Sequence, residues 1–272
     1  MSEIERGDRF AFGENWARFL KGLTEQKIDS SQRSISDLFG QTSFAGLSFL
    51  DIGSGSGLSS LVAARMGAEV RSVDFDPQSV ACTDELRSRY FRGSRKWTVE
   101  QGSALDAKYM RGLGLYDIVY SWGVLHHTGN MWLGIENAIA CVKPDGRLML
   151  AIYNDQGWKS RFWWLVKATY NALPKWASLG FGYALGYSIT AAVVLRHLLF
   201  FRFGAVKQLL FSPYRRGMSR RHDMIDWMGG FPFEVATATV LTDYMAARGF
   251  TVEKAVVAAS LGCHEIIFRR RS

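Results

Sequence analysis

Two groups of residues in this chain could move a proton. The first is the adjacent pair His126 and His127, and the second is His222 with Asp223 and Asp226. An unperturbed imidazole titrates near pH ~6.5, so it can take a proton from a hydroxyl group at neutral pH. A neighbouring carboxylate can orient such a base. General acid–base chemistry at a histidine is therefore the first hypothesis.

Both groups also have structural interpretations. A histidine that follows a strand can cap the next helix, and neighbouring His and Asp residues are common in turns. The two groups could instead meet and hold a divalent cation, because imidazoles and carboxylates suit such an ion. Nothing in the sequence shows that they meet, so we predict no metal site.

The clearest ligand-binding pattern lies at residues 49–57, which read FLDIGSGSG. Residues 47–52 are apolar and β-prone, and from Leu58 onward the apolar residues recur at helical spacing. The alternating glycines between them allow a tight turn. A strand, a glycine turn and a helix in this order let a cofactor approach backbone that lacks Cβ atoms, beside the partly positive start of the helix.

A second predicted strand, residues 69–73, leads directly into Asp74. An acidic residue about 20 positions after the first glycine can accept hydrogen bonds from both ribose hydroxyls of an adenosine. The glycines read G-x-G-x-G, and Leu58 stands where the dinucleotide fingerprint needs glycine or alanine, so NAD is disfavoured. We therefore expect an adenosine-type ligand that is smaller than a dinucleotide.

The elements that must position these residues alternate as in a parallel α/β sheet. Further strands are predicted at residues 97–101, 116–122, 147–153, 250–257 and 265–268. The ends of such strands share one edge of the sheet, where ligands bind. A length of 272 residues suits one large domain with an insertion. We expect N-terminal helices, a cofactor-binding core, a helical insertion and a return to the core, at residues 1–45, 46–155, 156–232 and 233–272.

Helices are expected around these strands wherever apolar residues recur at helical spacing. Two precede the sheet, and the second of them ends at Gly40. Between the fourth and fifth strands a helical stripe runs from Trp132 to Val142. Residues 144–146, which read PDG, are expected to turn the chain back into the sheet.

The predicted insertion begins with a helix from Trp158 to Pro174, followed by residues 176–195 without any charged side chain. Such a run of about 20 residues could reach across a membrane, but glycine, serine and threonine dilute it, so a buried or interfacial helix is the better interpretation. Basic and apolar residues then alternate over 196–221 and could hold an anionic lipid surface. The alternative is a solvated lid whose aromatic side chains form a small core.

Composition narrows the possible classes of protein. Hydrophobic residues make up 48% of the chain and charged residues only 21%, which excludes disorder. The net charge of +8 favours an anionic partner, which could be a membrane surface, a phosphorylated substrate or nucleic acid. The three cysteines form no C-x-x-C and indicate neither a disulfide framework nor a zinc site. The charged start of the chain lacks a secretory signal, so we expect a cytoplasmic protein.

Five linked motifs resemble those of class I S-adenosylmethionine-dependent methyltransferases in order and spacing. They are FLDIGSGSG at 49–57, VDFDP at 73–77, QGSALD at 101–106, YDIVYS at 116–121 and VKPDGR at 142–147. The runs WGVLHH at 122–127 and RHD at 221–223 are most similar to the quinone and small-molecule O-methyltransferases of ubiquinone-biosynthesis type. The resemblance implies a Rossmann-like seven-stranded sheet with an antiparallel pair at its edge, a helical insertion after the fifth strand, and S-adenosylmethionine as cofactor.

The resemblance also implies roles for residues along the carboxyl edge of the sheet. Residues near the methionine part and ribose would be Gly53, Ser54, Gly55 and Gly57, with Asp74 on the ribose hydroxyls, Phe75 over the adenine, and Ser103 and Ala104 at the adenine edge. Asp51 and Trp122 complete the candidate cofactor-binding residues. Many members of the family carry Asp where Ser103 stands, so the Ala104 backbone amide could provide part of the adenine contact.

The histidine pair falls where the resemblance places the methyl acceptor. The candidates for a general base are then His127, His126 and, in the closing part of the insertion, His222. Successive residues at a strand end point in opposite directions, so we expect only one of the adjacent pair to face the acceptor.

The leading hypothesis is methyl transfer to a hydroxyl of a small or lipid-linked acceptor, of phenolic, quinol-like or sugar type. The acceptor, and an anionic membrane surface at which the protein would be peripheral, are the expected partners. A nucleic-acid or nitrogen-directed methyltransferase is a second possibility, favoured by the basic charge but lacking an N-P-P-Y-type motif after the fourth strand. A non-catalytic, membrane-associated adenosyl-binding module is the third.

Overall fold

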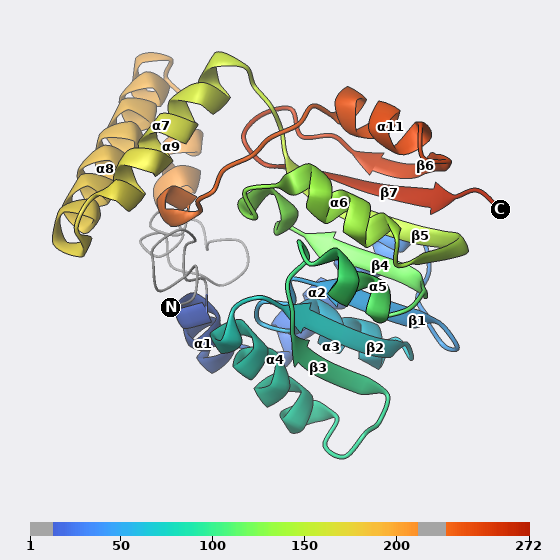
Figure 1. Ribbon diagram of the computed structural model, residues 1–272. Coiled ribbons are helices and arrows are strands. Elements are labelled where there is room, and N and C mark those ends of the chain that lie inside the picture. Colours follow the sequence, from blue (N-terminus) through green and yellow to red (C-terminus); the bar gives the residue numbers. More distant parts are fainter. Residues whose placement is uncertain (1–12, 212–226) are drawn as a thin grey trace.

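The computed structural model describes residues 13–211 and 227–272 of the chain. A seven-stranded sheet crosses the molecule in the order β3-β2-β1-β4-β5-β7-β6 (Figure 1). Its strands are β1 Ser48–Ile52, β2 Glu69–Asp74, β3 Trp97–Gln101, β4 Tyr116–Trp122, β5 Val142–Tyr153, β6 Phe250–Val256 and β7 Cys263–Arg270. The predicted α/β sheet is confirmed.

The direction of the strands creates one edge at which ligands can bind. Strand β1 lies between β2 and β4 and is parallel to both. The chain moves outward from β1 to β2 and β3 and then returns to β4 on the other side of β1, so the strand order reverses there. Ligands of open α/β sheets bind beyond the carboxyl ends of the strands at this kind of switch point. The predicted antiparallel edge is also confirmed, because β7 pairs antiparallel with both β5 and β6.

Helices cover both faces of the sheet and bury it. On one face are α1 Gly13–Lys21, α2 Glu25–Phe39, α3 Leu58–Arg65 and α4 Pro77–Tyr90, and on the other are α5 Ala107–Gly112, α6 Met131–Ile139 and α11 Ala238–Ala246. Neighbouring strand residues point to opposite faces. Phe49 accordingly belongs to the first core and Leu50 to the second, and both are fully buried. Burial on two sides explains the continuous apolar run in β1.

The prediction that Val142 closes a helix is wrong. Helix α6 ends at Ile139, and β5 already begins at Val142. Val142 pairs with Tyr116 of β4, the next pair is Arg147 with Ile118, and the residues between them form an irregularity in the strand. Asp145 takes a left-handed conformation there, with φ of 58°. A fully buried β-branched residue beside a strand partner favours the sheet over a last helical turn.

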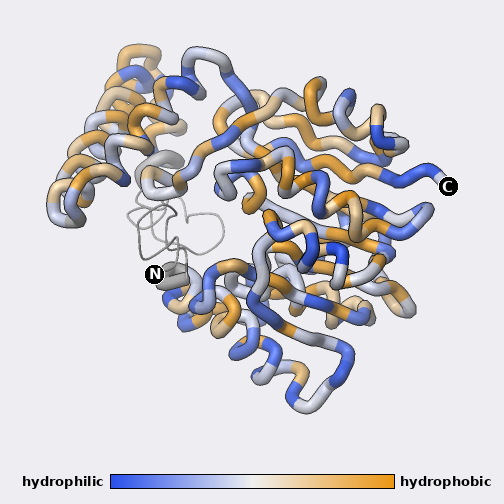
Figure 2. Tube along the Cα trace, in the orientation of Figure 1, coloured by the Kyte–Doolittle hydropathy of each residue, from blue (hydrophilic) through white to orange (hydrophobic). Residues whose placement is uncertain are grey.

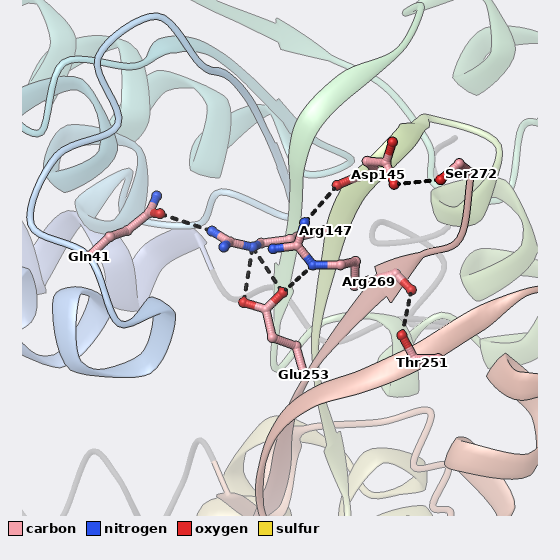
Figure 3. Close-up of polar contacts among 7 residues, drawn as sticks. All are labelled: Gln41, Asp145, Arg147, Thr251, Glu253, Arg269 and Ser272. Atoms are coloured by element: carbon pink, nitrogen blue, oxygen red, sulfur yellow. Dashed lines mark hydrogen bonds and ion pairs between the residues drawn. The ribbon is translucent and has the colours of Figure 1, made fainter.

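A polar network fastens the antiparallel edge of the sheet to the end of α2 (Figure 3). The Nε atoms of Arg147 and Arg269 donate to the Glu253 carboxylate at 3.1 and 2.8 Å. Arg147 also donates to Oε1 of Gln41 at 3.0 Å, and Arg269 to the carbonyl of Asp145 at 3.3 Å. These side chains are partly exposed, so each ion pair contributes at most about 1 kcal/mol. Their effect is to hold β5, β6 and β7 in register.

Three further helices follow β5 and project from the body of the molecule (Figure 1). They are α7 Trp158–Ala172, α8 Lys175–Leu199 and α9 Phe203–Phe211. Residues Trp176–Leu199 are long and apolar enough to cross a membrane, with a mean hydropathy of 1.5, although buried helices of soluble proteins can meet the same criterion. Here only 17% of that window is buried. Helix α8 is therefore mainly a surface helix, which excludes the buried alternative expected from the sequence.

The insertion helices expose large apolar side chains. Trp158 and Trp176 are 73% and 80% exposed, and Phe201 is 80% exposed. Hydrophobic residues recur along this projecting part of the chain (Figure 2). This apolar insertion surface, made by exposed residues of α7, α8 and the start of α9, contrasts with the buried sheet core.

Candidate cofactor and acceptor site

The glycine turn lies at the switch point between β1 and β4. Gly53 has a φ of 78°, and a Cβ atom added to it would lie 2.4 Å from the side chain of Val124. A Cβ atom on Gly57, whose φ is also 78°, would lie 2.9 Å from the Cα atom of Thr83. Both positions therefore require glycine for two reasons, conformation and space. The turn offers a close approach to bare backbone at the start of α3.

Asp74 connects the end of β2 to this turn. Its Oδ2 atom accepts a hydrogen bond from the Gly55 amide at 2.9 Å, and its Oδ1 atom accepts one from the Asp76 amide at 2.9 Å. Burial raises the pKa of Asp74 to about 6, and these amide hydrogen bonds oppose the rise. The side chain is only half-buried, and each carboxylate oxygen has a second lone pair. A ribose hydroxyl pair therefore fits the remaining acceptor capacity of Asp74.

The residues predicted to meet the adenine lie beside one another at the ends of β2 and β3. The Phe75 carbonyl accepts a hydrogen bond from Gln101 Nε2 at 3.1 Å, which joins the two strand ends. Ser103 Oγ accepts from the Leu105 amide at 3.2 Å, and the Ala104 carbonyl accepts from Asn137 of α6 at 2.8 Å. All three predicted residues are half-buried. Their role in binding adenine stays a prediction.

His126 and His127 occupy a 3-10 turn, Leu125–His127, directly after β4. The two imidazole rings lie edge to face with centroids 4.4 Å apart, so they are not on opposite sides as strand geometry would place them. His126 is fully buried, and its ring lies 4.0 Å from that of Tyr153, the last residue of β5. His127 is half-buried, and its Nδ1 atom lies 2.6 Å from the Pro232 carbonyl oxygen.

The partner of His127 determines its tautomer. A carbonyl oxygen only accepts hydrogen bonds, so Nδ1 carries the proton and Nε2 is the basic nitrogen of the neutral ring. Burial lowers the pKa of His127 to about 3, and the positive charge of Lys167 lowers it further. Burial likewise holds the pKa of His126 well below its usual range, with His127 and Lys167 adding to the effect. Both rings are therefore neutral at physiological pH.

Comparison of the sequence with known proteins indicates one family. The family model for a methyltransferase domain matches residues 50–148. A ubiquinone biosynthesis O-methyltransferase of Rhodopseudomonas palustris strain BisA53 is 27% identical over 199 residues, which cover 72% of each chain. The corresponding protein of Nitrobacter winogradskyi is 26% identical over 209 residues, covering 76% of this chain and 74% of its own. Residues 50–148 of the chain are a methyltransferase domain of the class I, S-adenosylmethionine-dependent type.

The fold of this methyltransferase is shared with distant solved structures. Magnesium protoporphyrin IX methyltransferase from Synechocystis PCC 6803, solved with S-adenosylhomocysteine, superposes with a TM-score of 0.52 at 15% identity. The likeness covers 90% of this chain and 82% of that one. An O-methyltransferase family protein from Burkholderia thailandensis superposes with a TM-score of 0.53 at 15% identity, covering 90% of this chain and 57% of that one.

Two predicted cofactor residues of the methyltransferase turn inward. Asp51 is buried and accepts a hydrogen bond from Ser60 Oγ at 2.5 Å, and Ser60 lies 2.6 Å from Ser72 Oγ. Burial raises the pKa of Asp51 to about 7. Ser54 Oγ lies 2.9 Å from Thr83 Oγ1 of α4. The side chains of Asp51 and Ser54 thus make hydrogen bonds within the protein next to the glycine turn. Contact of these side chains with the cofactor stays a prediction.

Trp122 also has a partner within the protein. Its indole nitrogen donates to Glu265 of β7 at 2.9 Å, across 143 positions of the chain. His222, and with it Asp223 and Asp226, lie outside the described residues. Within the part of the chain that the structure describes, no group of three or more His, Cys, Asp and Glu side chains could hold a metal ion.

Sequence reasoning missed the residues that surround the histidines. Tyr153 contacts both imidazole rings, and its own ring lies 5.2 and 5.3 Å from those of Trp227 and Phe233. Lys167 of α7 is fully buried against the same Trp227 and Phe233. A single lysine on the apolar side of a predicted helix was the one available signal for it. Nothing local connects these residues to the histidine pair.

The geometry predicts that Asp74→Ala weakens binding of S-adenosylhomocysteine by roughly tenfold to a hundredfold, about 1.5 to 3 kcal/mol for charge-assisted hydrogen bonds. Calorimetric titration measures this effect directly. Glu85→Ala, an exposed carboxylate on α4, is the matched control and should bind normally. Thermal unfolding of the ligand-free variant checks that the turn still forms without the Gly55 contact. Unchanged affinity in the folded Asp74 variant would remove Asp74 from the site.

Proposed function

We propose that this methyltransferase acts on a hydroxyl group of a small or lipid-linked acceptor, with His127 as the general base. The observation that carries the proposal is the placement of a half-buried, neutral imidazole at the end of β4, beside the switch point of the sheet. The names of the two bacterial relatives, both O-methyltransferases, support the choice of oxygen.

The reaction requires an in-line arrangement and the removal of one proton. When bound, the cofactor supplies a sulfonium methyl group, which the acceptor oxygen displaces. The protein must orient the acceptor oxygen and take up its hydroxyl proton as the new C–O bond forms. His127 can take that proton at Nε2, because its Nδ1–H is held by the Pro232 carbonyl.

The electrostatics of His127 favour one class of hydroxyl. A ring whose pKa is lowered by burial is a weaker proton acceptor than free histidine, so an acidic hydroxyl suits it better as methyl acceptor. A phenol has a pKa near 10, as tyrosine does, whereas alcohols are far less acidic. This comparison supports a phenolic or quinol-like acceptor over a sugar.

His126 is better suited to positioning than to proton transfer. It is fully buried, and among the described residues neither of its ring nitrogens has a hydrogen-bond partner of good geometry. The backbone of Ala151 only partly opposes the lowering of the His126 pKa. Its ring instead packs between His127 and Tyr153.

The proposed activity predicts that labelled S-adenosylmethionine transfers its methyl group to a 4-alkylcatechol in the presence of the full-length chain. The product should be a methyl ether, identified by mass spectrometry. An alkyl glucoside and total RNA serve as competing acceptors in the same assay. Label found in RNA, with none in the catechol, would favour the nucleic-acid alternative and reject this proposal.

His127→Ala should lower kcat by roughly a hundredfold or more, as expected for loss of a general base. The affinity for S-adenosylhomocysteine should change by less than about twofold, because the removed group does not hold the cofactor. His197→Ala on α8 is the matched control and should keep the normal rate. A full rate in the His127 variant with a phenolic acceptor would show that another group takes the proton.

We also propose that the apolar insertion surface contacts an anionic membrane, which would make the protein peripheral at the inner membrane. The support is the exposure of aromatic side chains such as Trp176 and Phe201 next to exposed basic residues Arg196, Arg202 and Lys207. Aromatic and apolar groups can enter the boundary of the acyl chains while basic groups pair with lipid phosphates. Such a surface suits the capture of a lipid-linked acceptor.

The membrane proposal predicts binding to phosphatidylglycerol vesicles at low salt, weaker binding at high salt, and little binding to neutral vesicles. Reversing two charges with Arg196→Glu and Arg202→Glu should weaken binding by about tenfold or more, since each basic residue near the surface contributes about 1 kcal/mol. Arg92→Glu with Arg95→Glu changes the net charge equally at exposed positions between α4 and β3 and should bind normally. Vesicle co-sedimentation distinguishes these results. Equal loss in both double variants would reduce the contact to net charge alone.

A further inference from the structure

Lys167 is a fully buried lysine inside the insertion. It lies on α7, and its neighbour Val166 and the nearby Tyr170 are each only 6% exposed. Its ammonium group donates a hydrogen bond to the Trp227 carbonyl. The same group lies 4.3 Å from the centroid of the Trp227 ring and 5.0 Å from that of Phe233. The ammonium therefore lies against the aromatic rings of Trp227 and Phe233, which we call the aromatic box.

This buried charge has no opposite charge beside it within residues 13–211 and 227–272. Lys167 takes part in none of the ion pairs of that part of the molecule, and its ammonium contacts one carbonyl and two aromatic rings there. Burial lowers the pKa of Lys167 to about 7. Lysine is almost never fully buried unless it is paired, because loss of its hydration costs several kcal/mol. An anion at this place would remove that cost.

The aromatic box adjoins the proposed acceptor position. Tyr153 contacts Trp227 and Phe233 as well as both imidazole rings. The charge of Lys167 acts on His126 and His127. Lysine, histidines and tyrosine thus form one cluster at the carboxyl ends of β4 and β5, where ligands of such sheets bind.

A second, independent feature of the cluster also indicates a missing partner. His126 is fully buried, yet within residues 13–211 and 227–272 neither of its ring nitrogens has a hydrogen-bond partner of good geometry. Buried polar side-chain atoms are normally satisfied. A polar group of a ligand between Lys167 and the histidines would supply the anionic partner that Lys167 lacks, and the hydrogen-bond partner that His126 lacks, among the described residues.

We propose that Lys167 binds an anionic oxygen of a group carried on an aromatic ring of the methyl acceptor. The ammonium would pair with the anionic oxygen, and the ring of the acceptor would lie against the neighbouring aromatic side chains. This inference rests on the proposed function, because it assigns the charge of the acceptor and the residue that recognises it.

Binding of such an anion would also change the strength of the base. The positive charge of Lys167 lowers the pKa of His127, so an anion that neutralises this charge raises it again. Among residues 13–211 and 227–272, the groups that face Lys167 are the carbonyl and ring of Trp227, the ring of Phe233, and the imidazoles of His126 and His127. Binding of the anionic acceptor would therefore raise the pKa of His127 and make it a stronger base while the acceptor is bound.

The test compares benzoate with benzamide, an uncharged probe of nearly the same shape, on the full-length protein loaded with S-adenosylhomocysteine. Calorimetry is expected to show benzoate binding about tenfold or more tightly than benzamide at about pH 7. The ammonium fraction falls as the pH rises above the pKa of Lys167, so the benzoate affinity should fall on the order of tenfold by about pH 8.5. Benzamide affinity should not change.

Lys167→Met removes the charge and keeps the length of the side chain, and it should abolish the preference for benzoate. Replacing a buried charge with an apolar group of similar volume often preserves stability. Thermal unfolding and binding of S-adenosylhomocysteine check that the variant is folded. Lys159→Met, an exposed lysine of the same helix near Trp158, is the control and should behave as wild type.

Several outcomes would overturn the proposal: no benzoate binding by the wild-type protein, equal binding of the two probes, a benzoate affinity independent of pH, or a preference that Lys167→Met retains. Because the measurement follows binding alone, it is separate from the test of activity. A protein that binds benzoate through Lys167 but methylates no hydroxyl would reject the proposed function and keep the anion site. Methylation of a phenol with unchanged KM in Lys167→Met would do the reverse.

Discussion

The hydrogen bond from the Gly55 amide to the Asp74 carboxylate is the contact on which the cofactor side of this methyltransferase depends. It joins the turn after β1 to the end of β2, while the second oxygen of the same carboxylate holds the Asp76 amide at the start of α4. Partial burial makes this charge costly, and the backbone amides offset the cost. One acidic side chain therefore shapes the turn and remains able to accept hydrogen bonds from a ribose.

The sheet places this turn opposite a second polar centre. Because β1 and β4 are parallel neighbours, the glycine turn after β1 and the histidine turn after β4 open on the same edge. Val124, which separates the two, packs directly against Gly53. A donor held on one side and an acceptor held on the other can then meet over the ends of these two strands, as an in-line displacement requires.

The insertion determines the electrostatics of the histidine turn, although it comes after β5 in the chain. Lys167 arrives from α7, whereas Trp227 and Phe233 come from the segment that leads back to the core. Together with burial, the lysine charge keeps both imidazoles neutral. The opposite side of the same helix exposes Trp158 and Phe162. Helix α7 thus carries a buried charge toward the site and apolar groups toward the outside.

The sequence alone determined the sheet, the glycine turn and the carboxylate after β2, because these features depend on residues close to one another in the chain. Periods of two and 3.6 residues, and glycines where the backbone turns, encode local conformation directly. The boundary at Val142 was harder to predict, since a buried partner across the sheet decided between helix and strand.

Only the tertiary structure decided the state of the histidines and the place of Lys167. The pKa of an imidazole depends on burial and on charges that come from distant parts of the chain. Lys167 lies 60 positions from Trp227, whose carbonyl it contacts, and His127 lies 105 positions from Pro232, which determines its tautomer. No local pattern connects such pairs, so the sequence could name the candidate base, while only the folded chain could show that it is neutral and lies beside a buried cation.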